Sequence, residues 1–307
     1  MTKQHTYILG AIALLVLAIV PFLGSLWAIY LVTEIMIFAL FALSFNLLLG
    51  FGGMISFGHA AYFAIGAYAC AILLTTLNLP LIIAFPASVV ISAIVALVIG
   101  YFCTRLTEIY FAMLTLAFAQ LIWAIAFKWV AVTGGDTGFI GVRVPEILDE
   151  PTRFYYFALT IVGLSGFVLW RIVNSAYGFT LSATRENRNR AEFIGVNVRR
   201  IQLVAFVLAG TFAGVAGALF TMFNHAVFVE SAWWTQSAEV MIMSILGGVG
   251  TFIGPAVGAV VLILLDRFIT EITAYWPTVL ACILLFILFF FPEGLTGFLS
   301  KRTGNKE

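Results

Sequence analysis

Charged side chains are scarce along this chain: Asp, Glu, Lys and Arg make up 9% of its 307 residues, whereas 63% are hydrophobic. So few charges cannot cover the surface of a soluble protein of this length. The apolar runs repeatedly reach the length of about 20 residues that a helix needs to cross a bilayer. The composition therefore predicts an all-α, polytopic transmembrane helical bundle.

Catalytic and metal-binding groups are scarce as well. The three cysteines lie in or beside apolar runs, and the three histidines show no ligand spacing, which argues against a disulfide framework or a metal site. The chain contains no G-x-x-x-x-G-K-[ST] phosphate loop, no H-E-x-x-H or C-x-x-C pair and no nucleophile elbow. We expect no catalytic activity, no cofactor and no metal, and the dispersed basic residues argue against a nucleic-acid partner.

One long polar stretch, residues 174–200, interrupts the apolar runs. It holds five arginines against only Glu186 and Glu192, and this excess of basic residues places it in the cytoplasm. Residues 181–194 contain no proline or glycine and predict a helix, which Gly195 is well placed to end in a left-handed cap.

The apolar residues of that helix, Phe179, Ala183, Ala191 and Ile194, share one side at helical spacing. This pattern fits a helix that lies beneath the membrane with its apolar side against a partner protein. A solvated loop whose arginines only set the orientation of the chain fits the same residues. Both interpretations stay open on the residues alone.

The remaining chain divides into apolar elements joined by short connections. Spans are predicted over residues 1–24, 29–49, 54–74, 81–103, 109–132, 154–172, 201–224 and 274–291, with two shorter pieces at 239–246 and 252–265, a total of about nine or ten elements. Arg105 places the turn 104–108 in the cytoplasm, and the acid-rich loop 133–153 belongs on the outer side. In the span 201–224, Ala205, Ala209, Ala213 and Gly217 form a row of small residues that favours close helix packing.

Glycine-rich breaks interrupt two apolar segments. GGVGTFIGPAVGA at 247–259 echoes GGMISFGHAAYFAIGA at 52–67, and Pro255 makes the second break firmer. Irregular backbone at membrane depth must be buried in protein or line a cavity. Two such breaks in corresponding halves, about 1–153 and 154–307, indicate a degenerate repeat within one transmembrane domain and a route between the repeats. The candidate residues of this route or its gate are Asn46, Gly52, Gly53, Ser56, His59, Gln120, Gly247, Gly248, Gly254 and Pro255. For His59 we favour a hydrogen-bonded packing role over that of a ligand or proton relay.

Acidic residues that could bind a coupling ion are few. Ion-driven carriers keep several ionisable residues at mid-depth, whereas here only Glu34 and Glu239 come near, and both lie close to segment ends. We therefore expect that Glu34 is not an energy-coupling group. The energy for transport is expected to come from another chain.

Five blocks of sequence resemble, in order, the LivM-type permease subunits of branched-chain amino acid ABC importers. They are FNLLLGFGGMISFGHAAYFAIGAY, in which Phe45 replaces the first of the usual small or apolar residues, IYFAMLTLAFAQ, TGGDTGF, YGFTLSATRENRNRAEFIGVNVRRIQLVAFVLAGTFAGVAGAL and GGVGTFIGPAVGA. The resemblance covers nearly the whole chain. One departure is Gln120, where relatives often have Glu, and this departure leaves the substrate and the polarity of the route open.

The resemblance implies one membrane subunit of an importer in the bacterial inner membrane. It would lie in lipid beside a LivH-like second permease subunit, be driven by two cytoplasmic ATPase subunits and be supplied by a periplasmic substrate-binding protein. By the same resemblance, the residues that contact the ATPases are Arg185, Glu186, Arg188, Ala191, Glu192 and Gly195. The substrate would be a branched-chain amino acid or a similar small polar solute, since the family also handles urea, amides and aromatic acids. An ion-coupled secondary transporter is the alternative, and a membrane scaffold or an intramembrane enzyme is a more distant one.

Overall fold

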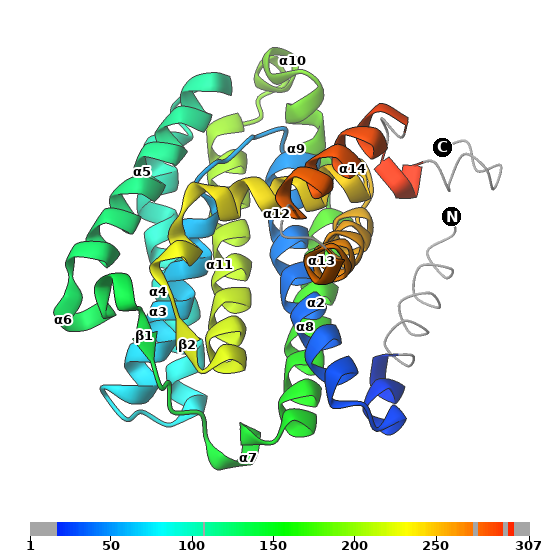
Figure 1. The fold of residues 1–307 in the computed structure, drawn as a ribbon. Helices are drawn as coiled ribbons and strands as arrows, with labels where there is room; N and C mark the ends of the chain where they lie inside the picture. The colour runs from blue at the N-terminus through cyan, green and yellow to red at the C-terminus, as the bar shows by residue number, and fades with distance from the viewer. Residues whose placement is uncertain (1–16, 107, 273–275, 291–293, 298–307) are drawn as a thin grey trace.

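The computed structural model describes residues 17–106, 108–272, 276–290 and 294–297 (Figure 1). Almost all of them are helical, which confirms the all-α prediction. The helices are η1 (Val20–Leu23), α2 (Leu26–Asn46), the π-helical turn η2 (Leu47–Phe51), α3 (His59–Thr75), α4 (Leu81–Cys103), α5 (Glu108–Lys128), α6 (Val130–Thr133), η3 (Gly135–Thr137), α7 (Glu146–Asp149), α8 (Pro151–Val173), α9 (Ala176–Glu186), α10 (Arg188–Phe193), α11 (Val198–Asn224), η4 (Val229–Ala232), α12 (Trp234–Gly247), α13 (Gly254–Ile272) and α14 (Trp276–Phe290). Strands β1 (Phe139–Ile140) and β2 (Ala226–Val227) pair antiparallel. Most of the predicted first span, residues 1–16, lies outside the described part.

Five of the described helices are long and apolar enough to cross a membrane: α2 continued through η2, α4, α5, α8 and α11. The predicted bounds of α4, α8 and α11 hold within three residues, whereas the predicted span 109–132 ends at Lys128 and is followed by the separate short helix α6. The piece predicted to end at residue 265 continues as α13 to Ile272, and Arg267 in this added part forms an ion pair with Glu34 of α2.

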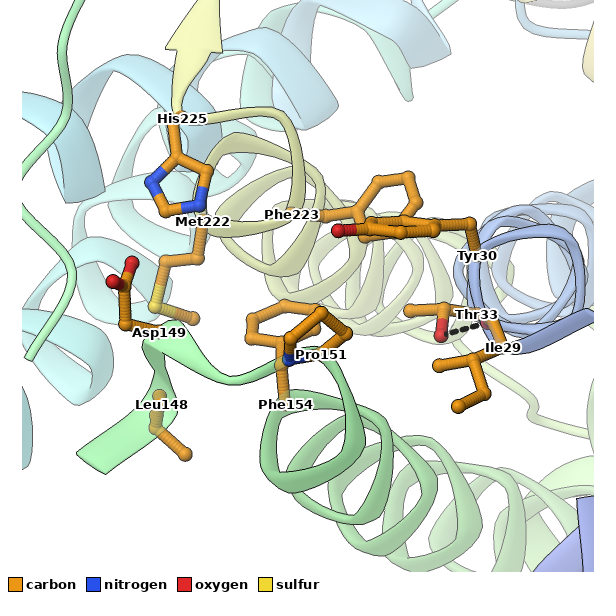
Figure 2. Close-up of a pocket in the computed structure, with 10 residues that line it drawn as sticks. All are labelled: Ile29, Tyr30, Thr33, Leu148, Asp149, Pro151, Phe154, Met222, Phe223 and His225. Atoms are coloured by element: carbon orange, nitrogen blue, oxygen red, sulfur yellow. Dashed lines mark hydrogen bonds between the residues drawn. The ribbon is translucent and has the colours of Figure 1, made fainter. Parts of the chain in front are cut away.

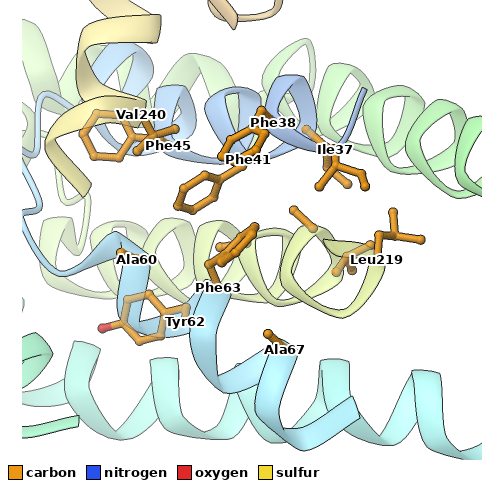
Figure 3. Close-up of a cluster of buried hydrophobic side chains, with 14 of the residues drawn as sticks. Ile37, Phe38, Phe41, Phe45, Ala60, Tyr62, Phe63, Ala67, Leu219 and Val240 are labelled. Carbon is orange, nitrogen blue, oxygen red and sulfur yellow. The ribbon is translucent and has the colours of Figure 1, made fainter. Parts of the chain in front are cut away.

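Aromatic side chains fill the core where α2, α3, α11 and α12 meet (Figure 3). The rings of Phe41 and Phe63 lie 4.6 Å apart, and Phe38 meets Phe220 edge to face at 5.7 Å. Such ring pairs contribute beyond the area that they bury. This cluster fixes the positions of the helices that lead into and out of the glycine breaks.

The small residues of α11 give close contact with α3 and α4, as predicted. Ala205, Ala209 and Ala213 are fully buried. A Cβ atom added at Gly66 of α3 would lie 2.5 Å from the Cα of Gly214, so the two backbones touch at this point. Small residues allow such an approach between membrane helices.

The connections predicted on opposite sides of the membrane lie at opposite ends of the bundle. Segment 174–200 and the turn after α4 meet at one end, which we call the basic end, where the guanidinium groups of Arg105 and Arg199 lie 4.4 and 5.1 Å from the ring of Tyr101. The acid-rich loop with α7 lies at the other end, here called the acidic end (Figure 1). The bundle therefore has the alternation that the charges predict.

The single helix predicted over residues 181–194 is wrong: the segment forms two helices, α9 and α10. Asn187 adopts an extended backbone between them, and its side-chain oxygen accepts a hydrogen bond from the Arg190 amide at 2.9 Å. An asparagine that caps a new helix in this way competes with continuation of the old one.

The apolar side that was predicted to face a partner protein is divided between exposed and buried residues. Phe179 and Ile194 are 69% and 76% exposed, whereas Leu181 and Ala191 are buried. The Tyr177 hydroxyl donates to the Ile201 carbonyl at 2.7 Å and fastens α9 to α11.

Candidate functional site

The first break begins where α2 loosens into the π-turn η2 and ends where α3 starts. The Gly52 and Met54 amides donate to the carbonyls of Leu47 and Leu48 at 3.1 and 2.9 Å, which bends the chain back over the end of the helix. Gly53 has a φ of +65°, a left-handed conformation that favours glycine. Ser56 is buried, and its hydroxyl accepts a hydrogen bond from the Gly58 amide at 3.4 Å.

The second break separates α12 from α13. Gly247 ends α12, and Gly248 follows with a φ of +117°. The Thr251 hydroxyl accepts a hydrogen bond from the Gly254 amide, the first residue of α13, at 3.1 Å. Pro255 is the second residue of α13, where its lack of an amide proton costs no helical hydrogen bond. The turn thus reverses the chain within six residues, 248–253, and lets α12 pack against α13.

The structure brings the two breaks into contact. Asn46 lies at the end of α2, is 1% exposed, and donates from its amide nitrogen to the Thr251 carbonyl at 3.0 Å. Thr296 joins the same site, because its hydroxyl donates to the Gly247 carbonyl at 2.6 Å and lies 2.9 Å from the Thr251 hydroxyl. Several backbone groups of both breaks are therefore hydrogen-bonded to protein groups, as irregular backbone at membrane depth would require.

Arg185 connects this site to the polar segment. It is the penultimate residue of α9, and its guanidinium Nη1 donates to the Gly50 carbonyl. The stem of the side chain lies against Gly53, where an added Cβ would be 2.7 Å from the Arg185 Cγ. One residue of segment 174–200 thus touches both ends of the GFGG sequence.

The other predicted coupling residues lie on α10 and around it. Arg188 and Glu192 form an i, i+4 ion pair at 3.1 Å, and Glu186 is exposed. Ala191 is 4% exposed, so it packs within its own chain. Gly195 has a φ of +89°, and the amides of Gly195 and Val196 donate to Glu192 and Ala191 at 3.0 Å, which confirms the predicted left-handed cap as a Schellman motif.

His59 and Gln120 lie apart from these contacts. His59 begins α3 with no exposed surface; its Nε2 is 2.9 Å from the Ser44 hydroxyl, and its ring stacks on Phe41. That environment agrees with the hydrogen-bonded packing role that we favoured, although the buried Nδ1 has no partner among the described residues. Gln120 lies on α5, at the left of the bundle in Figure 1, and its buried Nε2 has no partner among the described residues.

Ionisable residues meet where α2, α12 and α13 come together. Arg267 donates to the Glu34 carboxylate at 2.5 Å, and Gln236 donates to Glu239 at 2.8 Å. Asp266 and Glu34 are close enough to Glu239 to interact with it by charge. The sequence showed Glu34 without a partner in its own span, and the structure supplies one from a helix 233 residues away.

Neither described cavity is a closed amino acid site. One, near the acidic end, has a volume of about 30 Å³ and is lined by residues of α2, α7, α8 and α11 (Figure 2). A cavity of this volume has room for only about two or three water molecules. The other, about 460 Å³, is an open hollow on the outward side of α5 beside Leu121 and Trp129.

The sequence did not indicate several residues that hold the site together. They are Ser44, Gly50, Ser237, Thr251, Thr296 and Arg267. The Ser237 hydroxyl accepts a hydrogen bond from the Ala60 amide at 2.9 Å. Gly50 and Thr251 lie within the glycine-rich blocks, and only this position in the sequence could have identified them as residues of the site. A lone serine or threonine in an apolar helix has no pattern that marks it.

Comparison with known proteins agrees with this architecture. The family model described as a branched-chain amino acid transport system permease component matches residues 27–291. The high-affinity branched-chain amino acid transport system permease protein LivM of Escherichia coli K12 is 27% identical over 321 aligned residues, covering 95% of this chain and 75% of that protein. A probable LivM of Methanocaldococcus jannaschii is 24% identical over 68% of this chain and 67% of its own length.

The autoinducer 2 import system permease protein LsrC of Shigella flexneri matches a shorter part, at 29% identity over 43% of this chain and 41% of its own. No solved structure matches. Because the family model spans nearly all of the described bundle, the chain belongs to the permease components of branched-chain amino acid transport systems, as a multi-pass membrane subunit with no ATPase site of its own.

Proposed function

We propose that this chain is one of the two membrane subunits of an ATP-driven importer for a branched-chain amino acid or a similar small polar solute. A LivH-like permease pairs with it, two cytoplasmic ATPase subunits drive it through segment 174–200, and a periplasmic binding protein delivers the solute. The observation that supports this proposal most directly is the exposure of three large apolar side chains, Phe179 on α9, Phe193 at the end of α10 and Ile194 directly after it, which we propose form one contact surface.

This surface is unusual for a connection outside the apolar spans. The three side chains are 69%, 92% and 76% exposed, and they share segment 174–200 with five arginines. Large apolar side chains with charged neighbours mark protein contacts, where a few buried anchors supply most of the binding energy. Arg188, Glu186 and Glu192 would form the polar rim, while Ala191 and Gly195 shape α10 from within.

A matched pair of substitutions tests the surface. Ile194→Asp places a charge in the proposed ATPase contact, and Ile147→Asp does the same at the acidic end, where Ile147 is 71% exposed. We expect Ile194→Asp to lose the ATPase subunits on co-purification and Ile147→Asp to keep them, with equal amounts of both variants in the membrane. Retention of the ATPases by Ile194→Asp would overturn the assignment of this surface.

The two glycine breaks are the proposed route or gate, with Asn46, Gly52, Gly53 and Ser56 in the first and Gly247, Gly248, Gly254 and Pro255 in the second. Re-entry of the chain at the second break explains how α12, with 14 residues, turns back without a full crossing. In this proposal the route is formed together with the second permease subunit. Gln120 and His59 would then shape the surrounding helices.

An ion-coupled carrier is the second candidate, because α2, α12 and α13 bring three acids and one arginine to the same part of the bundle. Glu34, Glu239 and Asp266 against Arg267 leave more negative than positive groups at this point of the bundle. Carriers use such intramembrane carboxylates to bind the coupling ion. Glu34 and Glu239 already have hydrogen-bond donors from the protein, which favours a structural role for them.

A further inference from the structure

We infer that Arg185 is a positioning residue that ties the coupling helix α9 to the first glycine break, so that movement of α9 moves the break. This inference rests on the proposed function. It gives Arg185 a role inside the chain, in place of the direct ATPase contact that the sequence suggested.

The bond between Arg185 and Gly50 meets a need of the backbone. The last carbonyls of a helix have no amide partner within it, and they carry the negative end of the helix dipole. Gly50 lies in the π-turn that ends α2, and the guanidinium of Arg185 donates to its carbonyl there. A guanidinium therefore satisfies an orphan acceptor and places positive charge where the dipole favours it.

The stem of Arg185 adds a steric contact to the hydrogen bond. Gly53 is the only residue of this break with a positive φ, and its missing side chain leaves the space in which the Arg185 stem lies. A Cβ at residue 53 would come within 2.7 Å of the Arg185 Cγ. Arg185 therefore contacts the break at two residues, Gly50 and Gly53.

Further contacts connect the first break to the second half of the chain. A Cβ at Gly50 would lie 2.8 Å from the Asn46 side-chain carbon, and the amide of Asn46 bonds to Thr251 of the second break. On the other side, the Tyr177 hydroxyl and the buried Leu181 fasten α9 to the bundle. Contacts thus run without interruption from α9 through the first break to the second. Such a packed and hydrogen-bonded chain is a physical means of coupling two sites.

The test uses the whole complex, with its second permease, ATPases and binding protein, reconstituted in vesicles. Arg185→Ala, Gly53→Ala and the double variant are compared with Arg153→Ala, a control that removes an arginine paired at the surface with Glu150 near the acidic end. The readouts are co-purification of the ATPases, ATP hydrolysis and the amount of solute taken up per ATP hydrolysed.

We expect Arg185→Ala to keep its ATPases and to hydrolyse ATP while uptake per ATP falls about tenfold, as loss of a hydrogen bond to a charged group would do to an equilibrium. Arg153→Ala should stay close to the unsubstituted complex. Gly53→Ala should impair coupling more in the original chain than in the Arg185→Ala background, because removal of the arginine also removes the clash. Arg185→Lys, which keeps the charge, provides a second variant and should retain more coupling than Arg185→Ala.

Three results would overturn the inference: normal coupling in Arg185→Ala, loss of the ATPases from that variant, or additive effects of the two substitutions. Uptake by the unsubstituted complex that needs no ATP would instead overturn the proposed function. The two failures are therefore distinguishable.

Discussion

Asn46→Ala removes the one described side-chain hydrogen bond that joins the first break directly to the second. The amide nitrogen of Asn46 donates to the Thr251 carbonyl at 3.0 Å, and Asn46 is 1% exposed. Alanine cannot donate this bond, and it leaves a small void beside Gly50. The substitution therefore separates the two breaks without touching α9 or α10.

The free-energy cost of Asn46→Ala depends on the hydrogen bond that is lost and on the unpaired polar atom that is removed. A hydrogen bond contributes about 0.5–1.5 kcal/mol net, and leaving a buried acceptor without a partner raises the cost to about 1–3 kcal/mol. The Asn46 carbonyl oxygen has no partner among the described residues, so its removal offsets part of that cost. We expect a net loss of about 1–2 kcal/mol, which changes a conformational equilibrium by a factor of about 5–30.

Asn224→Ala is the matched control. The Asn224 amide also donates to a backbone carbonyl, that of Phe220 at 3.3 Å, but this bond lies within α11 and is exposed. Both variants are purified with the complex, and solute uptake and the melting temperature of the permease are measured. Asn46→Ala should lower both, with a shift of roughly 2–4 °C for each kcal/mol, while Asn224→Ala should change neither. Equal behaviour of the two variants would refute a structural link between the breaks.

Three further predictions concern the cap, the second break and the ion pair. Gly195→Val forces a branched residue into a φ of +89°, at a cost of about 1–2 kcal/mol, and Ala191→Trp overfills a buried site. Both substitutions should uncouple ATP hydrolysis from uptake or release the ATPases. Unchanged ATP hydrolysis and unchanged co-purification in both variants would count against the role of α10. Gly254→Val places a Cβ 2.6 Å from the Thr251 hydroxyl oxygen, so uptake should fall in a transport assay, and normal uptake by an assembled variant would show that the second break is incidental. Glu34→Gln should leave uptake unchanged, because the Glu34 carboxylate is paired with Arg267 and therefore does not bind a coupling ion. Abolished uptake by a normally assembled variant would contradict this prediction.

Much of the helical framework could be predicted because apolar length and charge asymmetry are local properties of a sequence. The bounds of α8 and α11 followed from where their apolar runs end, and the small residues of α11 indicated its close packing. Gly195 identified the end of α10, since few residues other than glycine adopt its backbone conformation.

The contacts between distant segments could not be predicted. Arg185 and Gly50 are 135 residues apart, and Asn46 and Thr251 are 205 apart. In each case the acceptor is a backbone carbonyl, which every residue has, so no residue type marks the partner. The break between α9 and α10 was not predicted for a related reason. The side chain of Asn187 caps a new helix, and helix propensity summed over the segment does not reveal which asparagine will do so.

The central claim is that ATP hydrolysis by separate subunits, and no ion gradient, drives transport through this chain. The most direct measurement is solute uptake by vesicles that contain the complete complex, with the internal ATP concentration held constant and ionophores added to collapse proton and sodium gradients. The account predicts that uptake requires ATP and continues at an unchanged rate after the gradients collapse. Uptake that stops with the ionophores while ATP is present, or that proceeds without the ATPase subunits, would contradict it and favour the carrier built on Glu34, Glu239 and Asp266.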